Sequence, residues 1–114
     1  MATIKAFSDL QQSKKLAEIL PIESADMYWW SSGKRYYIEA MDDGDFNEGE
    51  GHIRAWSLAA LLSVLPEIQG GKPAISLDDN YITYPHVSDL HTKADNLIDA
   101  CYEIIIKLNE LNLL

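Results

Sequence analysis

Three histidines, His52, His86 and His91, are the side chains of this chain best suited to proton transfer or metal binding near neutral pH. His86 and His91 flank Asp89 in a segment rich in turn-forming residues, which we expect to be a connector that imposes no common face on them. A small hydrolytic or metal-dependent enzyme would need at least two of the histidines to meet in a cleft with a carboxylate. The pattern favours turn and cap roles, so we predict no catalytic residue, no metal and no cofactor.

An acidic stretch, residues 41–52, has oxygen ligands at the alternating positions that suit calcium. Three of them match the first ligand positions of an EF-hand loop, namely Asp43, Asp45 and Asn47. The match ends there, because Glu48 stands where that loop needs a glycine and Arg54 where it needs a bidentate glutamate. The stretch has three glycines and no apolar periodicity, and we predict a solvated acidic loop.

Cys101 and Ser57 are the two nucleophiles whose settings can be judged from the sequence. Cys101 lies in an apolar stripe with nothing nearby to lower its pKa, so we expect a packed core thiol. A single cysteine also excludes an internal disulfide and a multi-cysteine zinc site. Ser57 lacks the Gly-x-Ser-x-Gly setting of a catalytic serine and is explained by helix capping.

The charge of the chain is unevenly distributed. The 114 residues include 9 basic and 18 acidic side chains, for a formal net charge of −9. Residues 1–40 hold five of each sign, so the whole excess lies in residues 41–114. Direct nucleic-acid binding, which needs clustered Lys and Arg, is therefore disfavoured. The acidic half suits a protein partner with a basic surface, or mimicry of nucleic acid toward a host protein that binds DNA.

Length and composition predict one globular domain over residues 1–114. Apolar residues make up 47% and charged residues 24%, as in folded domains. A chain of this length can bury about two-thirds of its unfolded surface without a disulfide or metal. The N-terminus has no apolar signal core, and no apolar run approaches the roughly 18 residues of a membrane span. We therefore expect a cytoplasmic protein without membrane contact.

Two capping boxes mark the expected starts of two helices. Ser8 with Gln11 would begin a helix that ends before Pro21. Thr92 with Asp95 would begin the C-terminal helix, which carries an apolar stripe at helical spacing. In the sequence, the other predicted elements lie between these two helices.

A third, short helix is expected over residues 58–65, between the other two. Ser57 would cap it, and Trp56 stands where it can pack on Leu61 as a hydrophobic staple. Because the segment is apolar almost all round, the helix should be buried. The leucine-rich C-terminal end, Leu108 to Leu114, is a candidate surface for self-association.

Residues 27–38 are predicted to form a β-hairpin with aromatic arms and a two-residue turn at Ser32-Gly33. That register places Trp30 opposite Arg35. Alternation gives one face suited to the core, made of Met27, Trp29, Tyr36 and Ile38. The other face is predicted to bind a protein partner, because aromatic and arginine side chains are enriched in binding hot spots, and it consists of Tyr28, Trp30, Arg35 and Tyr37. The alternative is that a helix covers this second face.

A second hairpin is predicted around a turn at Asp79-Asn80, with Leu77 opposite Ile82 and Ile75 opposite Tyr84. The expected fold class is therefore α+β. Two β-hairpins form a small antiparallel sheet that packs with three helices, in the order α-β-β-α-β-β-α.

Four short segments stand out when they are taken together. They are Gln12-Ser13-Lys14-Lys15-Leu16, Ser24-Ala25-Asp26-Met27, Ala55-Trp56-Ser57-Leu58-Ala59-Ala60-Leu61-Leu62 and Asp99-Ala100-Cys101-Tyr102-Glu103. With them the chain resembles, over most of its length, a group of small proteins that recur in prophages and other mobile elements of gut bacteria. The resemblance implies an accessory protein of a phage-like element in the bacterial cytoplasm. The group has no assigned activity, so no site residue carries over.

Three functional hypotheses follow from these patterns. The first is a non-enzymatic protein-interaction module that uses the aromatic hairpin face, with the acidic half steering it toward a basic partner. The second is an acidic nucleic-acid mimic that inhibits a host DNA-binding protein. The third is a small metal-dependent or hydrolytic enzyme that uses the histidines.

Overall fold

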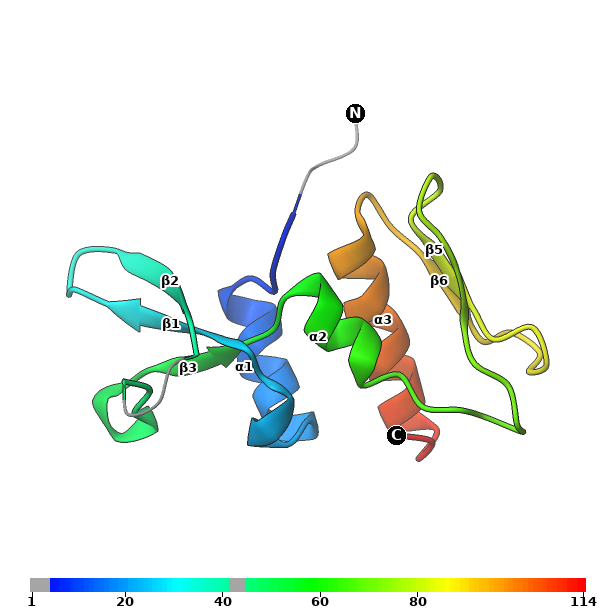
Figure 1. Cartoon of the computed structure of the whole chain (residues 1–114), viewed down its shortest axis with the longest axis horizontal. Coiled ribbons are helices and arrows are strands. Elements are labelled where there is room, and N and C mark those ends of the chain that lie inside the picture. The colour runs from blue at the N-terminus through cyan, green and yellow to red at the C-terminus, as the bar shows by residue number, and fades with distance from the viewer. Residues whose placement is uncertain (1–4, 42–44) are drawn as a thin grey trace.

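The computed structural model describes residues 5–41 and 45–114 as an α+β fold, which confirms the predicted class. Within these ranges, three α-helices accompany two separate three-stranded antiparallel sheets. The first sheet projects from one end of the molecule, and strands of the second lie at the other end, beyond the last helix (Figure 1). The two predicted hairpins therefore do not join into one sheet.

The first sheet has the strand order β2-β1-β3. It consists of β1 (Met27–Ser31), β2 (Tyr36–Ala40) and β3 (Ile53–Ala55). In the β1–β2 hairpin, Trp30 lies opposite Tyr37 instead of Arg35. The pairing is shifted by two residues from the predicted one, which preserves the predicted division into two faces because side chains alternate with a period of two.

The β1–β2 connection has four residues, 32–35, and not two. Gly33 adopts a φ of 95°, which glycine reaches without steric cost, and its N–H donates to Ser31 Oγ at 3.0 Å. Ser32 N–H still donates to the Arg35 carbonyl at 3.1 Å. Arg35 consequently lies in the connection, immediately before β2.

The first helix, α1 (Leu10–Ile19), begins one residue later than predicted. Asp9 is its N-cap and forms a capping box with Gln12. Ser8 does not cap this helix, because its hydroxyl accepts from the Trp56 N–H at 3.0 Å and its own N–H donates to the Trp56 carbonyl at 2.8 Å. Ser8 therefore connects the start of α1 to the chain that leaves β3.

The last helix, α3 (Leu97–Glu110), also begins later than predicted. Asn96 caps it by accepting from the Asp99 N–H at 2.9 Å. Thr92 is buried in a strand, where its hydroxyl donates to the Ala100 carbonyl at 2.7 Å. The predicted capping box of Thr92 and Asp95 is therefore wrong, since the threonine attaches the second sheet to α3.

The second sheet has the order β4-β5-β6 and packs against α3. Its strands are β4 (Ala74–Ser76), β5 (Tyr81–Thr83) and β6 (His91–Lys93). Ile75 lies opposite Ile82, so the connection again has four residues instead of the predicted two. Leu77 belongs to this connection and is 71% exposed, where the predicted register had paired it with Ile82.

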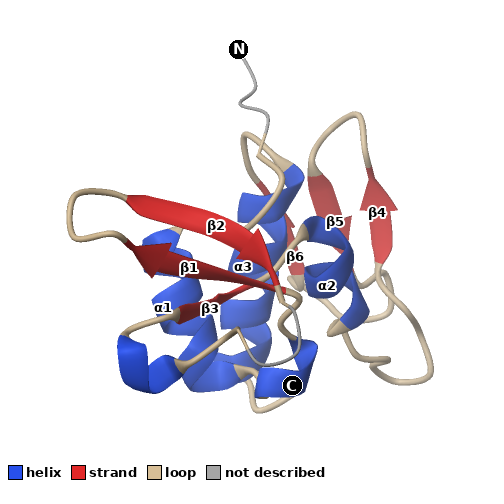
Figure 2. Cartoon of the chain, turned by 60° about the vertical axis from the view of Figure 1, so that its left-hand side comes forward, coloured by secondary structure: helices blue, strands red, loops and turns tan. Residues whose placement is uncertain are grey.

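The core lies among the three helices and the inner face of the second sheet (Figure 2). The short helix α2 (Leu58–Ser63) is capped by Ser57, as predicted, with the Ala60 N–H as donor at 3.2 Å. The largest fully buried side chains include Trp56, Leu61, Ile98, Ile104 and Ile105. Two 3-10 turns, η1 (Ile22–Ser24) and η2 (Glu48–Glu50), complete the described elements.

The hairpin face that was predicted to join the core does not do so. Its members are half-buried or exposed, namely Met27, Trp29, Tyr36 and Ile38. The reason is that the sheet projects beyond the helices, so that only its base packs on the body (Figure 1). No helix in residues 5–41 and 45–114 has the length and hydropathy needed to cross a membrane.

Candidate functional site

The outer part of the β1–β2 hairpin carries a stacked aromatic pair. The rings of Trp30 and Tyr37 lie 4.7 Å apart between centroids, with 26° between their planes. Trp30 is half-buried and Tyr37 is 40% exposed. Arg35 is exposed beside them in the connection. These three residues, Trp30, Arg35 and Tyr37, form what we call the aromatic surface.

Tyr28 belongs to the same face of the sheet, but it is buried, with 3% of its surface exposed. The ring of His52 stacks on it at 5.1 Å and Phe46 meets it edge-on at 5.6 Å. Its hydroxyl donates to Glu39 Oε2 at 2.9 Å. Tyr28, which was predicted to contact a partner, is therefore largely inaccessible in this structure, because the chain after β2 returns over this end of the face.

Trp30 has a further property that the sequence does not reveal. Its indole N–H is buried and has no hydrogen-bond partner among the described residues. A buried donor without an acceptor typically costs about 1–3 kcal/mol. The aromatic surface therefore combines an exposed tyrosine ring with a buried indole N–H that has no acceptor among the described residues.

The opposite face of the hairpin is anchored at its base. The Trp29 indole N–H donates to the Ser8 carbonyl at 3.1 Å, and the Trp29 ring meets Phe7 edge-on at 5.5 Å. Tyr36, further out on this face, is 44% exposed. Anchoring at the base therefore leaves the outer hairpin accessible on both faces.

In the described part of the acidic stretch, residues 45–52 form a turn whose polar groups bond to one another and to Arg54. Asn47 Oδ1 accepts from the Gly49 N–H at 2.9 Å, and the Asn47 N–H donates to His52 Nδ1 at 3.0 Å. Glu48 pairs with Arg54. Asp43, the first proposed calcium ligand, lies outside the described residues. Within the described ranges, no three His, Cys, Asp or Glu side chains gather in a way that could hold a metal ion.

The three histidines have different neighbours. His52 packs on Tyr28, and its pocket also contains Glu48. The ring of His86 lies over Gly71, where an added Cβ would come within 2.3 Å of it. His91 lies beside Tyr81, with ring centroids 5.8 Å apart. Because His52 and His91 line separate pockets, these two do not provide the shared cleft that the enzyme hypothesis requires.

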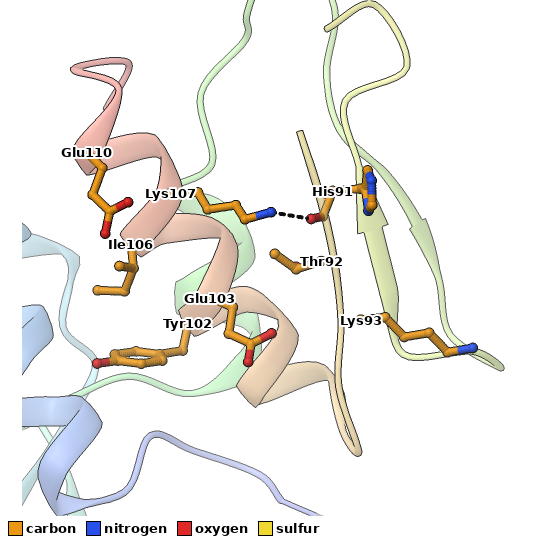
Figure 3. Close-up of a pocket in the computed structure, with 8 residues that line it drawn as sticks. All are labelled: His91, Thr92, Lys93, Tyr102, Glu103, Ile106, Lys107 and Glu110. Atoms are coloured by element: carbon orange, nitrogen blue, oxygen red, sulfur yellow. Dashed lines mark hydrogen bonds between the residues drawn. The ribbon is translucent and has the colours of Figure 1, made fainter. Parts of the chain in front are cut away.

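A groove of about 610 Å³ is lined by β6 and by the neighbouring surface of α3, and no sequence pattern predicted it (Figure 3). Tyr102 and Ile106 line it from α3, on a different side of that helix from the predicted apolar stripe. Lys107 donates from Nζ to the His91 carbonyl at 3.1 Å across the groove. The charged side chains around it have both signs, so its charge does not select one class of ligand.

A polar cluster connects α1 to α3. Asp99 accepts from Lys5 Nζ at 2.8 Å, from Gln12 Nε2 at 2.7 Å and from Asn96 Nδ2 at 3.0 Å. Partial burial raises the pKa of Asp99, but these donors outweigh it and hold that pKa below its usual value. Because Asp99 of α3 accepts hydrogen bonds from Gln12 of α1 and from Lys5, which precedes α1, this cluster stabilises the contact between the two helices.

Two further predicted features have clear positions. Cys101 is fully buried in the core, and burial raises its pKa to about 12, as expected of a packed thiol. At the C-terminal end, Leu108 is buried, whereas Leu111, Leu113 and Leu114 are 56%, 37% and 43% exposed. These three leucines are the accessible part of the predicted self-association surface.

Comparison of this chain with protein-family models, with curated proteins and with solved structures finds no match in any of the three.

Proposed function

We propose that this protein is a non-enzymatic interaction module whose aromatic surface binds a protein partner. The observation that carries the proposal is the Trp30–Tyr37 stack, which lies on a projecting hairpin with Tyr37 40% exposed. Stacked aromatic side chains offer large contact area at little entropic cost, and an adjacent arginine adds charged hydrogen bonding. Binding would also remove the remaining solvent from around the pair.

The setting of this interaction follows from the sequence. We propose an accessory role for a phage-like element in the bacterial cytoplasm, in keeping with the resemblance described above. The net charge of −9 would accelerate encounter with a partner that has a basic surface, even where the charged residues lie outside the contact. Such steering weakens as salt is added.

The test is affinity capture of partners from a source-cell lysate with the tagged protein, compared among three variants at low and moderate salt. Trp30→Ala and Tyr37→Ala should each lose a protein that the unchanged chain retains. Tyr36→Ala is the matched control, because it removes a similarly exposed tyrosine from the other face of the same strand. Equal capture by all the chains, with folding intact, would overturn the assignment of the aromatic surface.

A further inference from the structure

The outer edge of β2 is an unpaired strand edge. Ser32 N–H donates to the Arg35 carbonyl and Met41 N–H to the Asp26 carbonyl, which fixes the register at both ends of the β1–β2 ladder. In that register Tyr37 and Glu39 exchange backbone hydrogen bonds with β1. The alternating residues Tyr36, Ile38 and Ala40 therefore direct their N–H and C=O groups away from β1, and no described strand pairs with them.

The other sheet edges in the described ranges are protected in ways that this one is not. β3 packs against α1. β6 lies against α3, and the His91 carbonyl accepts from Lys107. β4 has only three residues and follows Pro73 directly. Short strands, prolines, charged side chains and covering helices are the usual means of blocking edge pairing. β2 has five residues without proline or lysine, and its single charged residue is Glu39.

The side chains along this edge are complementary to a second copy of themselves. Arg35 immediately precedes β2 and Glu39 lies near the end of that strand, with Tyr37 midway between them. By alternation Tyr37 and Glu39 lie on the face of the Trp30–Tyr37 stack. The hydrogen bond from Ser32 N–H to the Arg35 carbonyl continues the ladder by one step, which assigns Arg35 to the same face. Glu39 is exposed, and the Tyr28 hydroxyl holds its carboxylate in place at 2.9 Å. An antiparallel partner strand would thus bring a positive end against a negative end.

We propose that two copies of this chain pair through β2, antiparallel and about a two-fold axis at Tyr37. Tyr36 of each copy then exchanges backbone hydrogen bonds with Ile38 of the other, and Arg35 of each lies opposite Glu39 of the other. The axis generates every contact twice, as in an isologous interface. Two three-stranded sheets become one six-stranded sheet, and the edge is removed.

The dimer extends the aromatic surface. Pairing brings the two Tyr37 side chains together at the axis and places both Trp30–Tyr37 stacks on one face of the joined sheet. This inference rests on the proposed function in one respect, since the same hairpin would offer its edge to a second copy and its face to the protein partner. A two-fold partner surface would match such a platform best.

Charge reversal with rescue tests the pairing. The purified chain is expected to have twice its monomer mass by light scattering at high concentration. Arg35→Glu and Glu39→Arg should each give a folded monomer, because each turns both ion pairs into like-charge contacts. The combination of Arg35→Glu with Glu39→Arg should restore the dimer. Failure of that combination to restore it, or a monomeric unchanged chain at all concentrations, would overturn the inference.

Amide hydrogen exchange of the unchanged chain provides a test that needs no variant. The Tyr36 and Ile38 amides should exchange more slowly as protein concentration rises. The Tyr37 and Glu39 amides are internal controls, because they already donate to β1 and should be much less affected. Concentration-independent exchange at Tyr36 and Ile38 would count against the dimer. A monomer that still loses its lysate partner through Trp30→Ala would leave the proposed function intact.

Discussion

The Trp30 and Tyr37 rings stack across the β1–β2 hairpin with their centroids 4.7 Å apart, while the buried Trp30 indole N–H has no acceptor among the described residues. The stack favours the hairpin and the unsatisfied donor opposes it. Both effects act on the same indole, and the β1–β2 ladder adds its backbone hydrogen bonds to the ring contact. Changes to this pair should therefore affect stability as well as binding.

The first prediction concerns this stack. Tyr37→Ala should lower the free energy of unfolding by about 0.5–1.5 kcal/mol beyond the loss of buried area, which is the typical contribution of an aromatic pair. Urea denaturation measures it, with Tyr36→Ala as the control of similar exposure on the opposite face. Equal losses in the two variants would show that the stack adds nothing to stability.

The second prediction concerns the polar cluster between α1 and α3. Asp99→Ala removes the acceptor for Lys5, Gln12 and Asn96, and should destabilise the chain by roughly 1–3 kcal/mol because partly buried donors lose their partner. Glu103→Ala is the control, since this exposed carboxylate lies one turn further along the same helix. Thermal unfolding of both variants measures the difference. Similar melting temperatures would contradict the assigned role of Asp99.

The third prediction is the pH dependence of that same cluster. Burial opposes the charged forms, but hydrogen bonds and the Lys5 charge lower the pKa values of Asp9 and Asp99 below 3.8 in the folded chain. As the pH falls, these carboxylates therefore take up protons at a higher pH in the unfolded chain than in the folded chain. The stabilisation is present above about pH 4 and is lost as the pH falls through the folded-state pKa values. Urea midpoints across acidic pH should decline less steeply in Asp99→Asn. An unchanged acid profile in that variant would contradict the prediction.

The sequence predicted elements and faces better than it predicted their ends. Both hairpins were placed correctly, but each has a four-residue connection, because a two-residue turn is a local preference that pairing further along the strands can override. Each face of the first hairpin keeps its predicted residues, because a shift of two residues preserves the alternation of side chains. Arg35 was consequently assigned to the right face and given the wrong neighbour.

Long-range contacts account for the rest of the differences. Ser8 and Thr92 have the residue types of helix caps, yet Ser8 bonds to Trp56 and Thr92 to Ala100, both in other parts of the fold. The strands β3 and β6 have three residues each, too few to show alternation in the sequence. The burial of Tyr28 likewise depends on Phe46 and His52, whose approach no local pattern encodes.

The last prediction concerns the single thiol. Cys101 is fully buried, and burial raises its pKa to about 12, so the native protein should hold almost no thiolate at neutral pH and expose none of it to a reagent. A disulfide reagent such as Ellman's should therefore modify Cys101 only as fast as the core opens, and the rate should rise steeply with urea. The control is Ser88→Cys, which places a second thiol at an exposed position in the β5–β6 connection and should react at once. Immediate modification of Cys101 in the folded, unchanged chain would mean that the contact between α3 and the core opens far more readily than its packing implies.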